Sequence, residues 1–262
     1  MDALSVVFPR LHPEGLRFII GFGIATLLLF LLWEPAGWLG LLATVWCYYF
    51  FRDPDRHTPL GPGLVIAPAD GVVCAVDQAA PPSGIDLPEA PVLRVGIFMN
   101  VFNCHVNRMP VDGKVTRSVY HEGKFLNASL DKASDENERQ ILAIDADSGE
   151  KLAVVQIAGL IARRIVCHVQ EGDDVLAGER FGIIRFGSRV DVYMPASASL
   201  LVAKGQKIVA GETVLADLTG TSPQRQVVIR CTALPKVRSV PRRAAPCRSS
   251  SRCRCAVWLR TF

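Results

Sequence analysis

Two uninterrupted apolar runs stand near the N-terminus, at residues 18–33 (FIIGFGIATLLLFLLW) and 36–51 (AGWLGLLATVWCYYFF). Glu34 and Pro35 separate them, so the pattern predicts two helices joined as a hairpin. Each helix would rise about 24 Å, less than the roughly 30 Å hydrocarbon core of a bilayer. We therefore expect a membrane-associated hairpin that lies shallowly, re-enters, or spans a thinned bilayer. A buried helix pair in a soluble domain is the alternative.

The basic residues beside the hairpin predict its orientation. Arg10 and Arg17 precede the apolar runs, and Arg52 and Arg56 follow them. Because positive residues stay on the cytoplasmic side, both ends of the hairpin and the rest of the protein are expected at the cytoplasmic face.

From Gly61 onward the pattern changes to short β-branched runs, such as LVIAPADGVVCAV and VLRVGIFMNVF, that turn residues separate. This pattern predicts a mainly β domain with few short helices. The best helix candidate is the charge-rich segment 127–141 (NASLDKASDENERQI), although an ordered surface loop fits it equally well.

An internal repeat refines the predicted fold. Residues 169–179 (VQEGDDVLAGE) recur as residues 202–212 (VAKGQKIVAGE), with the shared pattern V-x-x-G-x-x-[VI]-x-A-G-E. The Asp-Gly pair of residues 70–71 also recurs at residues 112–113. These units resemble the flattened β-barrels of lipoyl and biotinyl domains, so we expect barrel-sandwich units. By analogy with lipoyl carriers, Gly187-Ser188 is expected at an exposed hairpin tip.

The distribution of charge sets the C-terminal residues apart from the rest of the chain. The net charge is +4, but residues 221–262 hold ten Lys and Arg and no acidic residue. Residues 1–220 therefore carry 19 basic against 25 acidic residues, a net charge of −6. We expect a hairpin (residues 1–56), a β-rich catalytic domain (57–220) and a disordered basic tail (221–262) without a nucleic-acid partner. No cysteine spacing fits a zinc site, so no metal is expected.

The Gly187-Ser188 pair allows two interpretations. It could be only a turn, in which glycine supplies a positive φ and serine a side-chain hydrogen bond. Alternatively, the serine hydroxyl could attack the glycine carbonyl and shift the peptide bond to an ester. Elimination and hydrolysis would then leave an N-terminal pyruvoyl group, a ketone that forms a Schiff base with an amine and withdraws electrons from it.

Six sequence motifs favour the second interpretation, because they resemble the motifs of a known family. They are FFRDPDR, IAPADGVV, FMNVFNCHVNRMPVDGKV, NER, QIAGLIARRIVC and RFGSRVDVYMP, and they occur in this order from residue 50 to residue 195. Together they closely resemble phosphatidylserine decarboxylase proenzymes of the short bacterial and archaeal type. The resemblance covers about residues 10–218. It implies a pyruvoyl-dependent decarboxylase that turns phosphatidylserine into phosphatidylethanolamine and CO2, with no separate cofactor.

The resemblance also implies roles for individual residues. Ser188 matches the serine that becomes the pyruvoyl group, and Gly187 matches the end of the first chain. Asp70 is expected to assist self-cleavage, although an Asx-type turn before Gly71 is the alternative. His105 is the candidate proton donor, for which a near-neutral pKa would suit. Arg108 stands where larger relatives carry a second histidine, so phosphate or carboxylate binding is expected instead.

Weaker expectations concern the remaining charged residues and the assembly. His121, Arg163 and Arg164 are substrate-binding candidates, with a loop contact or a solvated strand end as alternatives. The resemblance implies a β chain (1–187) paired with an α chain (188–262), leaves higher oligomers open, and places the enzyme at the bacterial inner membrane. An uncleaved membrane-anchored adaptor or carrier of the lipoyl-like class remains the competing hypothesis.

Overall fold

Short strands dominate the chain beyond the N-terminal helices. The computed structural model describes residues 9–85, 87, 90–123, 137–159, 164–185 and 188–220. All of them lie in the first of two units of the chain, Met1–Val227. The segment 127–136, Arg163, Gly187 and the basic tail are outside the described residues, and with them most of the predicted helix 127–141.

The two apolar runs form the predicted helices, with a different break between them. The short 3-10 helix η1 (Pro13–Gly15) leads into α2 (Leu16–Leu32), and α3 (Glu34–Phe50) follows. The only residue between α2 and α3 is Trp33, which is extended at φ −163° and ψ 114°. Pro35 lies inside the first turn of α3, where its missing N–H leaves no helical hydrogen bond unmade. The break between the helices is therefore the single residue Trp33, and not the predicted pair Glu34-Pro35.

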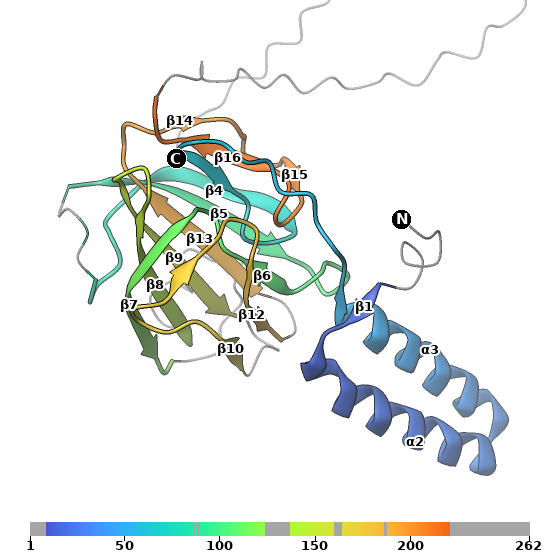
Figure 1. The fold of residues 1–262 in the computed structure, drawn as a ribbon. Helices are drawn as coiled ribbons and strands as arrows, with labels where there is room; N and C mark the ends of the chain where they lie inside the picture. The colour runs from blue at the N-terminus through green and yellow to red at the C-terminus, as the bar shows by residue number, and fades with distance from the viewer. Residues whose placement is uncertain are drawn as a thin grey trace, which may run out of the picture. The chain divides into compact units, whose positions relative to one another are not determined.

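Helices α2 and α3 lie side by side (Figure 1), and small and polar residues occupy the contact between them. The Thr26 hydroxyl lies 2.9 Å from the Thr44 hydroxyl, and Thr44 also donates to the Gly40 carbonyl at 2.9 Å. A Cβ atom at Gly37 would lie 2.2 Å from the Phe30 ring, so glycine is needed for this approach. Small residues and interhelical hydroxyl bonds are typical of helix pairs in lipid.

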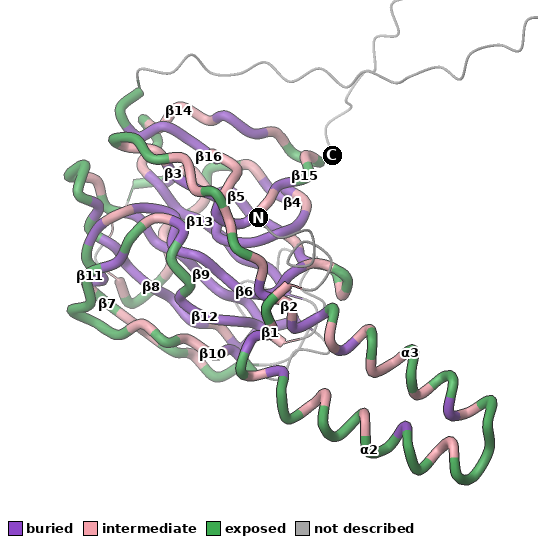
Figure 2. Tube along the Cα trace, turned by 45° about the vertical axis from the view of Figure 1, so that its right-hand side comes forward, coloured by how far each residue is buried: buried purple, intermediate pink, exposed green. Residues whose placement is uncertain are grey.

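The outward surface of the hairpin is apolar, as the exposed stretches of both helices in Figure 2 indicate. Leu27, Leu31, Leu39 and Leu42 are each at least two-thirds exposed. The segment Pro13–Leu32 is long and apolar enough to cross a membrane. Such a surface is unfavourable in water, so the hairpin indicates membrane association.

Within the described residues, the strands form one large sheet and three small ones, all with antiparallel pairs. The large sheet has the order β11-β7-β8-β9-β13-β5-β4-β15. Its strands, in that order, are Asp174–Val175, Gly113–His121, Arg139–Ala146, Lys151–Ala158, Ser188–Met194, Val92–Met99, Gly71–Ala79 and Lys207–Ile208.

The small sheets complete the β structure (Figure 1). One has the order β10-β12-β6 (Ile165–Cys167, Arg180–Ile184, Val106–Arg108), and another the order β14-β16-β3 (Ser199–Leu200, Val214–Asp217, Leu64–Ile66). The third pairs β1 (Arg10–Leu11) with β2 (Arg52–Asp53). The main core, which includes Ile97, Val154, Val190 and Phe181, joins residues of the large sheet and of the two three-stranded sheets. The predicted mainly β fold class is confirmed.

The sequence repeat is also a structural repeat. In the first copy β11 pairs with the start of β7, and in the second β15 pairs with the start of β4. The N–H of Ala177 donates to Asp112 Oδ1 at 2.7 Å, and the N–H of Ala210 donates to Asp70 Oδ1 at 2.8 Å. Asp70 and Asp112 therefore occupy equivalent turns, which allows their other contacts to be compared directly.

Candidate active site

Ser188 is the first residue of the central strand β13. Its partners across the sheet are Met99 of β5 and Ala158 of β9. The residue is fully buried, and its hydroxyl lies 4.0 Å from the Met99 sulfur, a weak acceptor. A small nucleophile is thus held between two strands, with no strong hydrogen bond to the hydroxyl among the described residues.

The expectation that Ser188 is exposed at a hairpin tip is wrong. Strand β12 pairs with β6 and β10, whereas β13 pairs with β5 and β9, so the two strands belong to different sheets. The lipoyl analogy placed both strands in one hairpin, but the chain changes sheets between them. Ser188 is consequently buried rather than presented to solvent.

A buried amide pair lies close to Ser188. Gln156 Nε2 donates to Asn107 Oδ1 at 2.7 Å, and Asn107 Nδ2 lies 3.8 Å from the Met99 sulfur that also contacts Ser188. Both amides are fully buried, and Gln156 Oε1 has no hydrogen-bond partner among the described residues. An unpaired buried carbonyl costs about 1–3 kcal/mol, so this polar group is destabilising unless it receives a donor.

His105 immediately precedes β6 at the same end of the molecule. Its carbonyl accepts from the Ile184 N–H at 3.4 Å, four residues before Ser188. Its Nδ1 lies 3.0 Å from the Asn103 carbonyl, which can only accept, so Nδ1 carries the proton and Nε2 is left as the acceptor. The imidazole also packs on the ring of Phe50, the last residue of α3.

The protonation of His105 differs from the sequence-based expectation. Burial is the main cause that lowers the pKa of His105 to about 4; the hydrogen bond to Asn103 opposes the shift, and the nearby Arg52 contributes to it. The expected near-neutral pKa is therefore wrong, because the fully buried ring is poorly solvated in its charged form. At neutral pH the imidazole is therefore uncharged.

Asp70 is held by a cation and a backbone group. Arg56 Nη2 donates to both carboxylate oxygens, at 3.0 and 2.8 Å, and the Ala210 N–H donates to Oδ1. Asp70 directly precedes β4, which pairs with β5 on the side opposite to β13. Two strand spacings, about 10 Å, therefore separate the backbones of Asp70 and Ser188. Burial raises the pKa of the Cys104 thiol most, and the Asp70 carboxylate raises it as well. The negative charge of Asp70 is therefore felt at Cys104, the residue directly before His105.

Arg108 has partners other than the substrate groups that were expected. Its guanidinium donates to the carbonyls of Gly178 and Pro54 at 2.8 and 2.9 Å, and it lies 3.5 Å from Asp53. Asp53 also accepts from Arg180 at 2.7 Å. These contacts, in a residue only 5% exposed, favour a structural role in which Arg108 fixes the segment after the hairpin.

The weaker candidates are spread around the site. His121 ends β7 and is half-buried, and its Nε2 has no hydrogen-bond partner among the described residues. Arg164 is exposed, and its carbonyl accepts from the Arg185 N–H at 3.3 Å. Arg163 and Gly187 lie outside the described residues. Substrate binding by His121, Arg163 and Arg164 stays a prediction.

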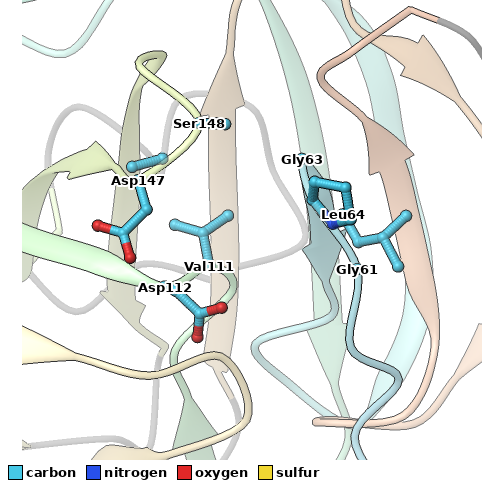
Figure 3. Close-up of a pocket in the computed structure, with 9 residues that line it drawn as sticks. Gly61, Gly63, Leu64, Val111, Asp112, Asp147 and Ser148 are labelled. Carbon is cyan, nitrogen blue, oxygen red and sulfur yellow. The ribbon is translucent and has the colours of Figure 1, made fainter.

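A pocket of about 150 Å³, drawn in Figure 3, is distant from this site. Asp112, Asp147 and Ser148 line one side of it, and Gly61 and Leu64 line the other. Asp147 and Ser148 precede β9, whereas Ser188 pairs with the last residue of that strand. About 25 Å of strand therefore separates this pocket from Ser188.

Arg56, Phe50 and Gln156 lie within the sequence motifs, but the sequence predicted no role in the site for these three residues. Arg56 binds Asp70, Phe50 packs on His105, and Gln156 binds Asn107. All three contacts join residues from different motifs. The available signal was that several motifs of one family occur in order in this chain, because residues of such motifs are expected to meet at one site. Among the described residues, no group of three or more His, Cys, Asp and Glu side chains could hold a metal ion.

The fold and the site can now be compared with those of known proteins. A mainly β domain follows an apolar N-terminal hairpin and buries both Ser188 and His105, whose imidazole is uncharged at neutral pH. The phosphatidylserine decarboxylase family model matches residues 43–216. Three proteins named phosphatidylserine decarboxylase proenzyme are similar to most of the chain.

The protein from Cereibacter sphaeroides is 56% identical over 230 residues, 88% of this chain and 99% of that protein. The one from Beijerinckia indica subsp. indica is 58% identical over 214 residues (82% and 92%), and the one from Ruegeria pomeroyi is 54% identical over 208 residues (79% and 95%). The chain belongs to the phosphatidylserine decarboxylase family. The resemblance and the enzyme class predicted from the motifs are thereby confirmed.

Proposed function

We propose that the chain cleaves itself between Gly187 and Ser188, and that the mature enzyme decarboxylates phosphatidylserine to phosphatidylethanolamine. The observation that carries the proposal is the position of Ser188. It begins a central strand, is fully buried, and lies at the end of the domain where His105 also lies. Membership of the family and the word proenzyme in the names of the relatives support the same reaction.

Self-cleavage needs only the chain and water. Ser188 Oγ attacks the Gly187 carbonyl carbon, and the C–N bond breaks to give an ester and a free amine on residue 188. Elimination removes the Cα proton of residue 188, breaks the Cβ–Oγ bond and releases Gly187 as a carboxylate. The dehydroalanine left behind tautomerises, and water replaces its nitrogen as ammonia, which leaves the pyruvoyl group.

The surroundings of Ser188 fit this product. The serine hydroxyl becomes unnecessary after elimination, and Met99 and Ala158 offer an apolar neighbourhood for the methyl group that replaces it. The weak contact with the Met99 sulfur leaves the hydroxyl available for attack. The pyruvoyl ketone supplies the electron sink that a decarboxylation needs.

The two chains are expected to stay together after cleavage. Strand β13 of the new α chain pairs on both sides with β5 and β9 of the β chain. Farther along the α chain, β15 pairs with β4 and β16 pairs with β3. Separation would expose a core strand on two sides, so a stable heterodimer of chains 1–187 and 188–262 follows.

His105 provides the proton chemistry of decarboxylation. A serine headgroup arrives as an ammonium and must lose a proton before its nitrogen can attack a ketone. The neutral imidazole accepts that proton at Nε2, because Nδ1 is held by Asn103. After CO2 leaves, the same nitrogen returns a proton to the α-carbon.

The segment after the hairpin connects the membrane to this site. Arg52, Asp53 and Arg56 contact Phe102, Arg180 and Asp70 respectively, so three consecutive links hold the end of α3 to the β domain. Residues 1–56 therefore act as the anchor and residues 57–220 as the catalytic domain. The positive residues flanking the hairpin support a catalytic domain at the cytoplasmic face.

Denaturing electrophoresis and intact-mass measurement of purified protein test the proposal. We expect a chain ending at Gly187, a chain of residues 188–262 with a blocked N-terminus, and CO2 release from phosphatidylserine. Ser188→Ala should remain whole and inactive, whereas the control Ser199→Ala, on β14, should be cleaved and active. Cleavage of Ser188→Ala at the same bond would refute the mechanism, and an uncleaved wild-type chain would favour the adaptor.

A further inference from the structure

The loop between β5 and β6 presents an apolar side chain to solvent. Two asparagines close it: the Phe102 N–H donates to Asn100 Oδ1 at 2.9 Å, and the Asn100 N–H donates to Asn103 Oδ1 at 2.8 Å. The Asn103 N–H also donates to the Asn100 carbonyl at 3.0 Å. This well-bonded turn leaves Phe102 61% exposed. A fixed, exposed phenyl ring is unfavourable in water.

The same loop is attached to the end of the hairpin. Arg52 donates from Nη2 to the Phe102 carbonyl at 3.0 Å and from Nη1 to the Tyr49 carbonyl at 2.6 Å. The Cys104 thiol donates to the Arg52 carbonyl at 3.2 Å. Phe102 is therefore held beside the last turn of α3, where the apolar hairpin ends.

Tyr49 and Arg52 mark the level of a membrane surface. The Arg52 guanidinium lies 3.7 Å from the centroid of the Tyr49 ring, and Tyr49 is 48% exposed. Tyrosine and arginine at the end of an apolar helix are typical of the boundary between hydrocarbon and headgroups. Val45 and Tyr49 are exposed one helical turn apart on α3, and Tyr49 is followed by Arg52, which contacts the loop that holds Phe102.

We infer that Phe102 inserts into the bilayer that holds the hairpin and forms a second membrane contact. The loop that inserts Phe102 also positions His105 through the Asn103 carbonyl. On the proposed function, this contact brings the site to the headgroup level, so that phosphatidylserine reacts without leaving the membrane. The partner is the lipid surface itself.

Tryptophan quenching tests insertion independently of catalysis. The purified protein would be mixed with vesicles of brominated phosphatidylcholine, which contain no phosphatidylserine. We expect Phe102→Trp to add quenched fluorescence beyond that of the unsubstituted protein, whereas Leu176→Trp, at an exposed apolar position next to β11, should add unquenched fluorescence. Equal quenching of the two added tryptophans, or none at position 102, would overturn the inference.

Kinetics then distinguish a membrane contact from a structural role. Phe102→Ser should be about tenfold slower on phosphatidylserine in vesicles, but unchanged on a short-chain phosphatidylserine below its micelle concentration. Leu176→Ser should match the unsubstituted protein on both substrates. An equal loss by Phe102→Ser on both would show that the loop acts only through His105, against the inference. If no variant decarboxylates either substrate, the proposed function fails while the quenching result stands.

Discussion

The ring of Phe50 packs on the ring of His105, with 4.2 Å between centroids and 30° between planes. Phe50 is the last residue of α3, so the hairpin contributes directly to the surroundings of the candidate catalytic histidine. The contact is part of a buried cluster that also includes Phe51, Cys104, Val106 and Ile183. On the proposed function, the membrane anchor and the catalytic histidine are therefore linked through packing.

Replacing Phe50 should alter the titration of His105. In Phe50→Leu the imidazole loses part of its cover, so its pKa should rise from about 4 toward its usual 6.5. As the pH is lowered, the imidazole of this variant would therefore become protonated at a higher pH than in the unsubstituted protein. We expect self-cleavage to be intact, turnover at neutral pH to fall about tenfold, and the acid limb of the rate profile to move upward.

The control for Phe50 is its neighbour in the same cluster. Phe51 is equally buried but stacks on Phe18, with 5.3 Å between centroids. Phe51→Leu should lose similar packing energy while the acid limb stays in place. The same shift of the limb in both variants would mean that general loosening, not the contact with His105, sets the profile.

The internal repeat supplies a matched pair for testing Asp70. Asp70 and Asp112 accept equivalent backbone hydrogen bonds, but Asp70 alone of the two is paired with Arg56. Asparagine keeps the acceptor oxygen and removes the charge. We expect Asp70→Asn to remain a single uncleaved chain on denaturing gels and Asp112→Asn to be cleaved normally. Normal cleavage of both variants would reduce Asp70 to a turn residue.

The exposed face of α2 allows a test of membrane association that leaves the fold alone. Leu27 and Leu31 are 67% and 83% exposed, so Asp at both positions should not disturb packing. Each charge would oppose insertion by about 2–3 kcal/mol near the bilayer centre. In flotation with vesicles, Leu27→Asp/Leu31→Asp should stay with the soluble fraction and the control Leu176→Asp should float. Unchanged flotation of the double variant would contradict anchoring by α2.

Patterns local in sequence predicted most of the fold. The two apolar runs gave α2 and α3, the turn-separated β-branched runs gave a mainly β domain, and the repeat gave two equivalent units. Such features depend on spacing along the chain, which periodicity reports directly. The lipoyl analogy failed at Ser188 because the chain changes sheets between β12 and β13, and local pattern carries no information about that step.

The site was predicted less completely, for a related reason. Motifs identified Ser188, His105 and Asp70, but the pairing of Arg56 with Asp70 spans fourteen residues and the stacking of Phe50 on His105 spans fifty-five. These contacts depend on how distant segments pack. The pKa of His105 was misjudged for the same cause, since burial by Phe50 and its neighbours lowers it.

The low pKa of His105 should also affect stability. Between about 4 and the usual 6.5, the unfolded chain binds a proton at His105 that the folded chain does not. Stability should therefore fall as the pH is lowered through this window, by about 2–3 kcal/mol in total. We expect the melting temperature of wild type to drop more than that of His105→Asn between pH 7 and pH 4.5. Parallel drops would show that His105 is not the group responsible.

His105→Ala separates maturation from turnover. Self-cleavage needs attack by Ser188 on Gly187, and Asp70 is the candidate for assisting it, whereas proton transfer at Nε2 of His105 is needed only once substrate has bound. His105→Ala should therefore yield both chains and a carbonyl that borohydride traps, yet release CO2 about two to four powers of ten more slowly, the usual contribution of a positioned acid or base. Electrophoresis, trapping and CO2 release would be measured on one preparation. An uncleaved His105→Ala chain would assign the histidine to maturation, and a cleaved, fully active one would leave it only its packing against Phe50.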